Sequence, residues 1–135
     1  MEPWIEIAEK EKGTHEVKGG ENPRIIEYHS VTNLKAQEDE VPWCAAFVCW
    51  CLEKSGFKST KSAWARSYLN YGEKLDHPKE GAIMVFQRGE DSGHVGFYIG
   101  EDKDFFHILG GNQHDEVCVG YYAKHKLLGI RWPVK

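Results

Sequence analysis

One segment of the chain, residues 42–54, limits the possible folds more than any other. It begins with Pro42-Trp43-Cys44 and contains no charged side chain until Glu53. A helix that is apolar on nearly every side must be surrounded by other elements of the fold. We therefore expect a helix from Pro42 to Lys54 at the centre of the domain, ended by Gly56.

Helical signals also occur before and after this segment. Pro3 and Gly13 suit the first position and the stop of a helix over residues 3–12. Asn22 and Pro23 suit the cap and first residue of a short helix that continues to residue 28. A further amphipathic helix is predicted over residues 63–71, and the polar stretch 32–41 is predicted to be a loop.

The hydrophobic pattern changes to a period of two after Gly81. Five strands are predicted, over residues 82–87, 94–99, 105–109, 117–122 and 127–132. Helices followed by a strand meander are typical of an α+β domain, in which an antiparallel sheet packs on the buried helix. With 135 residues, the chain is expected to form a single domain, residues 1–135.

Charge and composition exclude several classes of function. The net charge is −4 and no run of Lys or Arg occurs, so we expect no binding to nucleic acid. No apolar run is long enough to span a membrane, and the first residues lack a signal-peptide pattern. We expect synthesis in the cytoplasm and no membrane insertion. Four cysteines, three of them within one predicted helix, indicate a reduced protein without disulfides.

Cys44 and His94 are the candidates for nucleophilic chemistry. Cys44 falls in the first turn of the predicted central helix, where free backbone N–H groups and the helix dipole favour a thiolate and can bind an oxyanion. His94 follows Gly93 at the start of a predicted strand. A cysteine activated by a histidine requires a third group that holds the imidazole. Asn112, in Gly110-Gly111-Asn112-Gln113, and His107 on the preceding strand are both candidates for that role.

The order of five short motifs resembles that of a known family, the small NlpC/CHAP-type cysteine peptidoglycan hydrolases, and within it the compact branch of phage lysins and bacterial wall hydrolases. The motifs are Pro42-Trp43-Cys44-Ala45-Ala46-Phe47-Val48, Ala65-Arg66-Ser67-Tyr68-Leu69, Gly93-His94-Val95-Gly96-Phe97, Leu109-Gly110-Gly111-Asn112-Gln113 and Leu128-Gly129-Ile130-Arg131-Trp132-Pro133. The resemblance implies a papain-like fold and cleavage of amide bonds in the stem peptides of the bacterial cell wall.

Carried over to this chain, the resemblance makes Cys44 the nucleophile and His94 the general base and then the acid. Asn112 matches the orienting position of the CHAP pattern, whereas His107 lies near a third histidine that is usual in NlpC enzymes. Trp43, Trp64 and Tyr68 are candidates to line a substrate groove, with packing in the core as the alternative for each. No metal and no cofactor are expected.

Other functions compete with this interpretation. A metal hydrolase would use His107, His114 and Cys118, although their spacing lacks the close pairs that are usual at zinc sites. A thiol acyltransferase, a general protease and a non-enzymatic wall-binding module are possible on the same fold. For the hydrolase, the expected partner is peptidoglycan, reached after release or secretion by another system. The protein is expected to be a monomer and either endolysin-like or an antibacterial effector, in the second case with an immunity protein.

Overall fold

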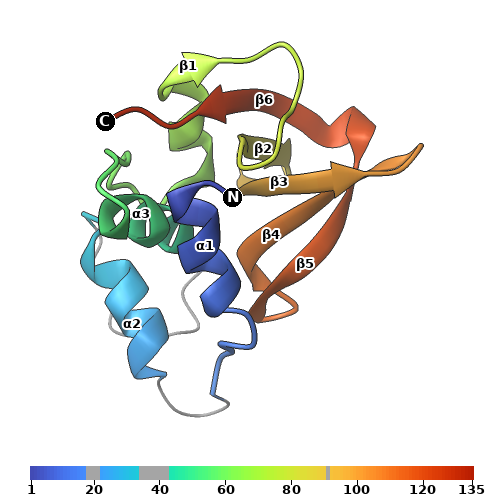
Figure 1. Cartoon of the computed structure of the whole chain (residues 1–135). Helices are drawn as coiled ribbons and strands as arrows, with labels where there is room; N and C mark the ends of the chain where they lie inside the picture. The colour runs from blue at the N-terminus through green and yellow to red at the C-terminus, as the bar shows by residue number, and fades with distance from the viewer. Residues whose placement is uncertain (18–21, 34–42, 91) are drawn as a thin grey trace.

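A computed structural model describes residues 1–17, 22–33, 43–90 and 92–135. The α-helices are α1 (Pro3–Lys10), α2 (Pro23–Ser30) and α3 (Cys44–Lys54), and two 3-10 helices are η1 (Ala65–Asn70) and η2 (Lys124–Lys126). The strands are β1 (Glu73–Lys74), β2 (Ile83–Gln87), β3 (Gly93–Glu101), β4 (Phe105–Gln113), β5 (Glu116–Ala123) and β6 (Leu127–Trp132) (Figure 1).

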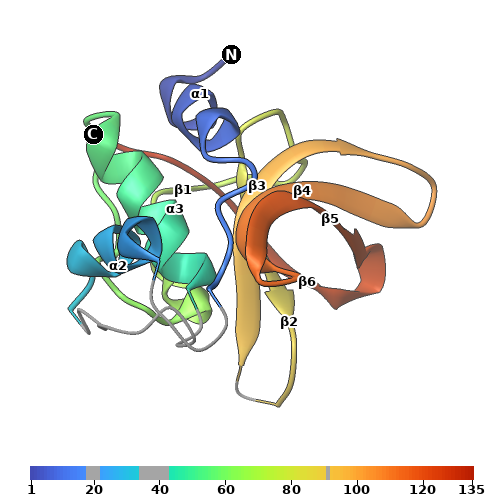
Figure 2. The same cartoon turned by 90° about the horizontal axis from the view of Figure 1, so that it is seen from below.

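The strands form one antiparallel sheet in the order β1-β6-β2-β3-β4-β5. The predicted α+β class is confirmed, and the sheet has six strands where five were predicted. The additional strand, β1, has only two residues, which pair with Trp132 and Arg131 of β6. A strand this short leaves no periodic signal in a sequence. The sheet is strongly curved, with β4 and β5 bending away from the helices (Figure 2).

The helices lie on one side of the sheet, and each face of the sheet has its own hydrophobic cluster (Figures 1 and 2). Val95 and Phe97 of β3 and Leu109 of β4 pack toward the helices. Met84 and Ile108 belong to the second cluster, on the concave face. Because side chains alternate along β3, one set packs against the helices and the other set faces the second cluster.

Helix α3 is the centre of the larger cluster, as predicted. Every residue from Cys44 to Leu52 is buried. The helix begins at Cys44, and Pro42, the predicted start, lies outside the described residues, as does most of the predicted loop 32–41. Helix α2 has the predicted cap, since the Asn22 side chain accepts a hydrogen bond from the Arg24 backbone N–H at 2.8 Å. All four cysteines are free, as expected.

The helix predicted over residues 63–71 is a shorter 3-10 helix, η1. The Ser62 hydroxyl accepts a hydrogen bond from the Trp64 backbone N–H at 3.0 Å and closes a turn ahead of it. The Arg66 guanidinium then donates to the carbonyls of Gly89 and Ser92, at 3.1 and 2.8 Å. Contacts with the turn between β2 and β3 therefore shape this segment more than its own helical propensity does.

Candidate active site

Cys44 is the first residue of α3 and is 5% exposed. Its thiol lies against the backbone N–H of Val95, the residue that follows His94 on β3. The close approach of the sheet to this end of the helix depends on Gly111 of β4. A Cβ atom at that position would lie 2.7 Å from the Trp43 ring and 2.8 Å from Phe47. The fold therefore places Cys44 against the strand residue that follows His94.

His94 is 1% exposed, and its ring is held on two sides. The Tyr122 ring stacks on it with centroids 4.7 Å apart and an angle of 14° between the planes. The imidazole Nε2 lies 2.8 Å from the Gln113 carboxamide oxygen. The stack fixes the plane of the imidazole, and the hydrogen bond fixes its rotation.

The hydrogen bonds of Gln113 determine which nitrogen of His94 carries the proton. The Gln113 amide nitrogen donates to the carbonyls of Ile108 and Cys118, at 3.1 and 2.6 Å. Its oxygen must therefore accept from His94 Nε2, as it also does from the Tyr122 hydroxyl at 3.1 Å. Within the described residues, His94 Nδ1 is buried and has no hydrogen-bond partner. That nitrogen keeps its lone pair and is able to accept a proton.

Burial keeps both members of the pair neutral. Loss of solvation raises the pKa of the Cys44 thiol, and the Val95 N–H and the Arg88 charge oppose this only in part. Loss of solvation also lowers the pKa of His94 to about 4, an effect that the Gln113 hydrogen bond opposes. The expected resting thiolate is therefore not what this environment favours. Cys44 therefore rests as a thiol and His94 as a neutral imidazole.

Gln113, rather than Asn112 or His107, makes the hydrogen bond to the ring of His94. The reason is a β-bulge: Gly110 pairs with Cys118, but Gln113 pairs with Glu116, so one extra residue lies on β4. Asn112 lies inside the bulge with φ of 57°. Simple alternation from Ile108 and Gly110 would bring Asn112 to the face of His94, and the extra residue transfers that position to Gln113.

His107 lies toward the other end of the sheet. It pairs with Gly100, six residues along β3 from His94, which corresponds to roughly 20 Å at the rise of a strand. Its Nε2 is 2.9 Å from the Asp102 carboxylate at the surface. The structure thus separates His107 from His94. Among the described residues, no three His, Cys, Asp or Glu side chains gather closely enough to hold a metal ion.

The predicted aromatic groove is only partly in place. Trp43 is fully buried, and its indole nitrogen donates to the Glu16 carboxylate at 2.9 Å. Tyr68 is also fully buried, with its hydroxyl 3.1 Å from the Cys49 sulfur. These two residues are part of the core because neither ring reaches solvent. Trp64 is 56% exposed and is the one of the three that a substrate is able to touch.

Sequence reasoning did not find three groups near the pair: Gln113, Tyr122 and Arg88. Tyr122 and Gln113 reach His94 from β5 and from the bulge of β4. Arg88 follows β2 directly, two residues beyond Phe86, which pairs with His94. The alternation of side chains along the β2–β3 hairpin indicates that Arg88 lies on the same face as His94, so the sequence could have identified Arg88. The bulge reverses the alternation on β4, so the sequence pattern did not indicate Gln113.

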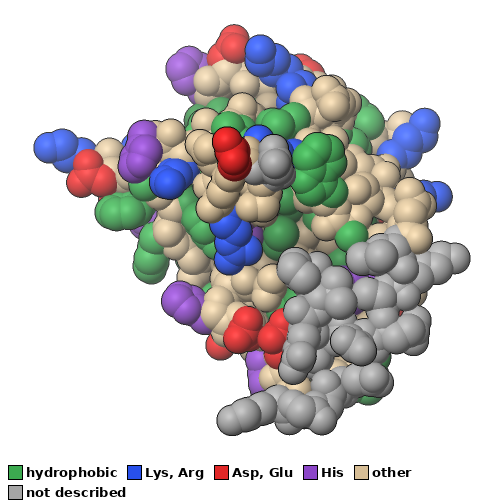
Figure 3. Space-filling view, turned by 180° about the vertical axis from the view of Figure 1, so that it is seen from behind, with side chains coloured by type: hydrophobic (Ala, Val, Ile, Leu, Met, Phe, Trp, Pro, Cys, Tyr) green, Lys and Arg blue, Asp and Glu red, His purple; other side chains and the backbone are tan. Residues whose placement is uncertain are grey.

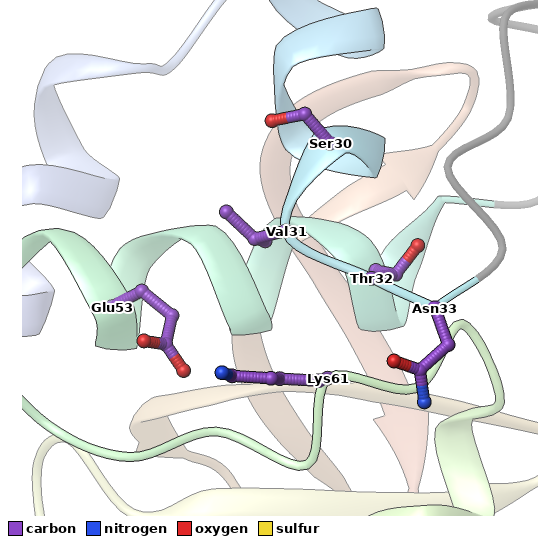
Figure 4. Close-up of a pocket in the computed structure, with 6 residues that line it drawn as sticks. All are labelled: Ser30, Val31, Thr32, Asn33, Glu53 and Lys61. Carbon is purple, nitrogen blue, oxygen red and sulfur yellow. The ribbon is translucent and has the colours of Figure 1, made fainter.

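A pocket of about 280 Å³ adjoins the site and is lined by Arg88, Gln113, His114, Gly120, Tyr121 and Tyr122. A second pocket, of about 360 Å³, is lined by Ser30, Val31, Thr32, Asn33, Glu53 and Lys61, and the side chains of Glu53 and Lys61 point toward one another across it (Figure 4). Glu53 is nine residues along α3 from Cys44, about 14 Å at the rise of a helix. The second pocket therefore does not adjoin the Cys44–His94 pair.

Acidic and basic side chains are interspersed over the described part of the face seen from behind (Figure 3). None of the described helices has the length and apolar character needed to cross a bilayer.

Cys44 at the N-terminus of α3, and His94 on the antiparallel sheet next to the strand residue that contacts the thiol, are the residue types that papain-like cysteine hydrolases use at these positions. The family model of the CHAP domain matches residues 36–112, more than half of the chain, and the chain belongs to this family. The family comprises peptidoglycan-hydrolysing amidases and peptidases with a papain-like fold. The matched region contains Cys44, His94 and Asn112 and ends one residue before Gln113. No curated protein matches the chain.

Proposed function

We propose that the protein is a cysteine peptidase or amidase that hydrolyses amide bonds in the stem peptides of peptidoglycan. Cys44 is the nucleophile, and His94 is the general base and then the general acid. Gln113 is the positioning residue that takes the place predicted for Asn112. The observation that carries the proposal is the state of His94: Nε2 is fixed by Gln113, while Nδ1 is buried and unpartnered beside the strand residue that contacts the Cys44 thiol.

The first half of the reaction forms a thioester. As the Cys44 sulfur attacks the carbonyl carbon, its proton passes to His94 Nδ1, and the carbonyl oxygen becomes an oxyanion. The N-terminal N–H groups of α3 have no acceptor within the helix, so the N–H of Cys44 is available to bind that oxyanion. The imidazolium then protonates the leaving amine, the C–N bond breaks, and the acyl group remains on sulfur.

The second half releases the acyl group. Water attacks the thioester carbonyl and gives a proton to His94 Nδ1, the C–S bond breaks, and the sulfur takes the proton back. Gln113 stabilises the imidazolium in both halves, because its side-chain oxygen accepts a hydrogen bond from the Nε2–H of His94 throughout, and the Tyr122 hydroxyl donates to the same oxygen and holds it in place. The product is a free carboxylic acid, and the protein returns to its starting state.

Digestion of purified peptidoglycan, followed by mass spectrometry of the released muropeptides, tests this proposal. The wild-type protein is expected to release fragments with new amino groups, and Cys44→Ala is expected to release none. Cys51→Ala is the matched control, because Cys51 is a buried cysteine of the same helix that lies outside the site. Release of fragments by Cys44→Ala would refute the assignment. The fragment masses also identify the bond that is cut.

A digestion with an added amine acceptor separates hydrolysis from acyl transfer. A hydrolase gives fragments with free carboxylic acids, and an acyltransferase gives fragments joined to the acceptor. Activity on an unrelated protein substrate, with none on peptidoglycan, would point to a general protease. We expect the hydrolytic products on peptidoglycan alone.

A further inference from the structure

The pocket of about 280 Å³ beside His94 carries one strong cation and no carboxylate among its lining residues. The cation is Arg88, which is exposed and forms no ion pair with any described residue. A guanidinium that has no ion-pair partner among the described residues is available to a ligand, and its planar group of donors suits a carboxylate.

The position of Arg88, directly after β2, places it on the same face of the sheet as His94. Phe86 pairs with His94 across the two strands, and residues two apart on a strand share a face. Arg88 therefore lies on the face of the sheet that carries His94. Its backbone N–H bonds to the Ser92 carbonyl at 3.2 Å, so the hairpin holds it in that register.

The pocket and the catalytic pair share residues. Gln113 and Tyr122 line the pocket and also contact the His94 ring. The charge of Arg88 lowers the pKa of both Cys44 and His94. A small group that occupied the pocket would thus contact the residues that hold the His94 ring. The volume suits a side chain or a terminus of the substrate, since complete ligand sites usually exceed about 300 Å³.

We propose that this pocket binds a carboxylate of the peptide substrate through the guanidinium of Arg88 and makes the enzyme selective for acidic stem peptides. This inference rests on the proposed function for its substrate. Stem peptides of peptidoglycan carry free carboxylates that some bacteria convert to amides. The pocket therefore distinguishes the acidic form of a stem from its amidated form.

The first experiment compares two synthetic stem peptides that differ only in one free carboxylate or its amide. The wild-type protein is expected to favour the acidic peptide in kcat/KM by about 10- to 100-fold, the range for hydrogen bonds to a charged group. Arg88→Gln should lose that preference and Arg88→Lys should keep part of it. Lys103→Gln, which removes the same charge in the exposed turn between β3 and β4, should behave as wild type. An equal loss on both peptides in Arg88→Gln would overturn the proposal.

The second experiment needs no peptidoglycan. Iodoacetate and iodoacetamide both alkylate the Cys44 sulfur and release iodide, but only iodoacetate carries a carboxylate. A changed thiol reactivity affects both rates alike, whereas carboxylate binding raises the iodoacetate rate alone. The ratio of the two rates should fall about tenfold in Arg88→Gln and stay at the wild-type value in Lys103→Gln.

The two experiments fail in different ways. If the wild-type protein hydrolyses no stem peptide but the alkylation ratio falls in Arg88→Gln, the proposed function fails and the carboxylate pocket stands. If stem peptides are hydrolysed and the ratio is unchanged in Arg88→Gln, the pocket proposal is wrong and the proposed function stands.

Discussion

The buried, neutral state of His94 predicts a specific loss of stability in acid. The pKa of this imidazole is about 4 in the folded protein, against an ordinary value of 6.5, because the ring has lost its solvent. The unfolded chain therefore takes up a proton at a pH at which the folded protein does not. The stabilising contribution is complete above pH 6.5 and is lost as the pH falls toward 4.

The magnitude follows from the size of the shift. One pKa unit corresponds to about 1.36 kcal/mol. Between pH 7 and pH 4, the free energy of unfolding should fall by about 3 kcal/mol through His94 alone. This is a large part of the stability of a small domain, which is typically about 5–15 kcal/mol.

Urea unfolding at pH 4, 5, 6 and 7, followed by tryptophan fluorescence, measures this contribution. In His94→Gln the slope of unfolding free energy against pH should be smaller than in the wild-type protein. Between pH 7 and pH 4 the wild-type protein should lose about 3 kcal/mol more unfolding free energy than the variant does. His125→Gln, at an exposed histidine, is the matched control and should follow the wild-type curve. Parallel curves for His94→Gln and wild type would show that the imidazole is not buried in neutral form, and the proton path through Nδ1 would then fail.

Two further predictions concern the β4 bulge and its contacts. Gln113→Ala should lower kcat by at least about 10-fold, because the imidazolium loses the acceptor that orients it. Asn112→Gly should keep kcat within about threefold. A larger loss in Asn112→Gly than in Gln113→Ala would return the orienting role to Asn112. Gly111→Ala should lower the unfolding free energy by about 1–3 kcal/mol and reduce activity, since its Cβ would meet Trp43 and Phe47 at 2.7–2.8 Å. Thermal unfolding checks this, and an unchanged Tm would contradict the close packing.

Patterns with many residues allowed most of the fold to be predicted from the sequence. The apolar run of α3 and the alternation after Gly81 each involve enough side chains to identify an element and its neighbours. Features that depend on one or two residues were not predicted. Strand β1 has only two residues, and η1 takes its form from the hydrogen bonds of Arg66 to a turn far away in the chain. Local sequence does not contain those contacts.

In the candidate site, too, the residues with a clear local pattern were predicted as candidates, and the contacts that depend on one or two residues were not. Cys44 and His94 were candidates because a helix start and a strand start are visible in the sequence, and the structure has Cys44 at the start of α3 and His94 near the start of β3. The hydrogen-bond partner of the His94 ring is one position beyond the predicted Asn112, because a bulge reverses the alternation of side chains on β4 and its signal is a single Asn with positive φ. Trp43 and Tyr68 were candidates for a groove because an aromatic side chain suits both a core and a surface, and only the three-dimensional structure shows which.

Acid quenching during turnover of a stem peptide, followed by intact-protein and peptide mass spectrometry, tests most directly whether Cys44 is the nucleophile. The proposed reaction predicts a mass increase equal to the acyl part of the substrate, present on the peptide that contains Cys44 and absent in Cys44→Ala. Turnover without an adduct on Cys44, at a rate that Cys44→Ala preserves, would contradict the proposed function.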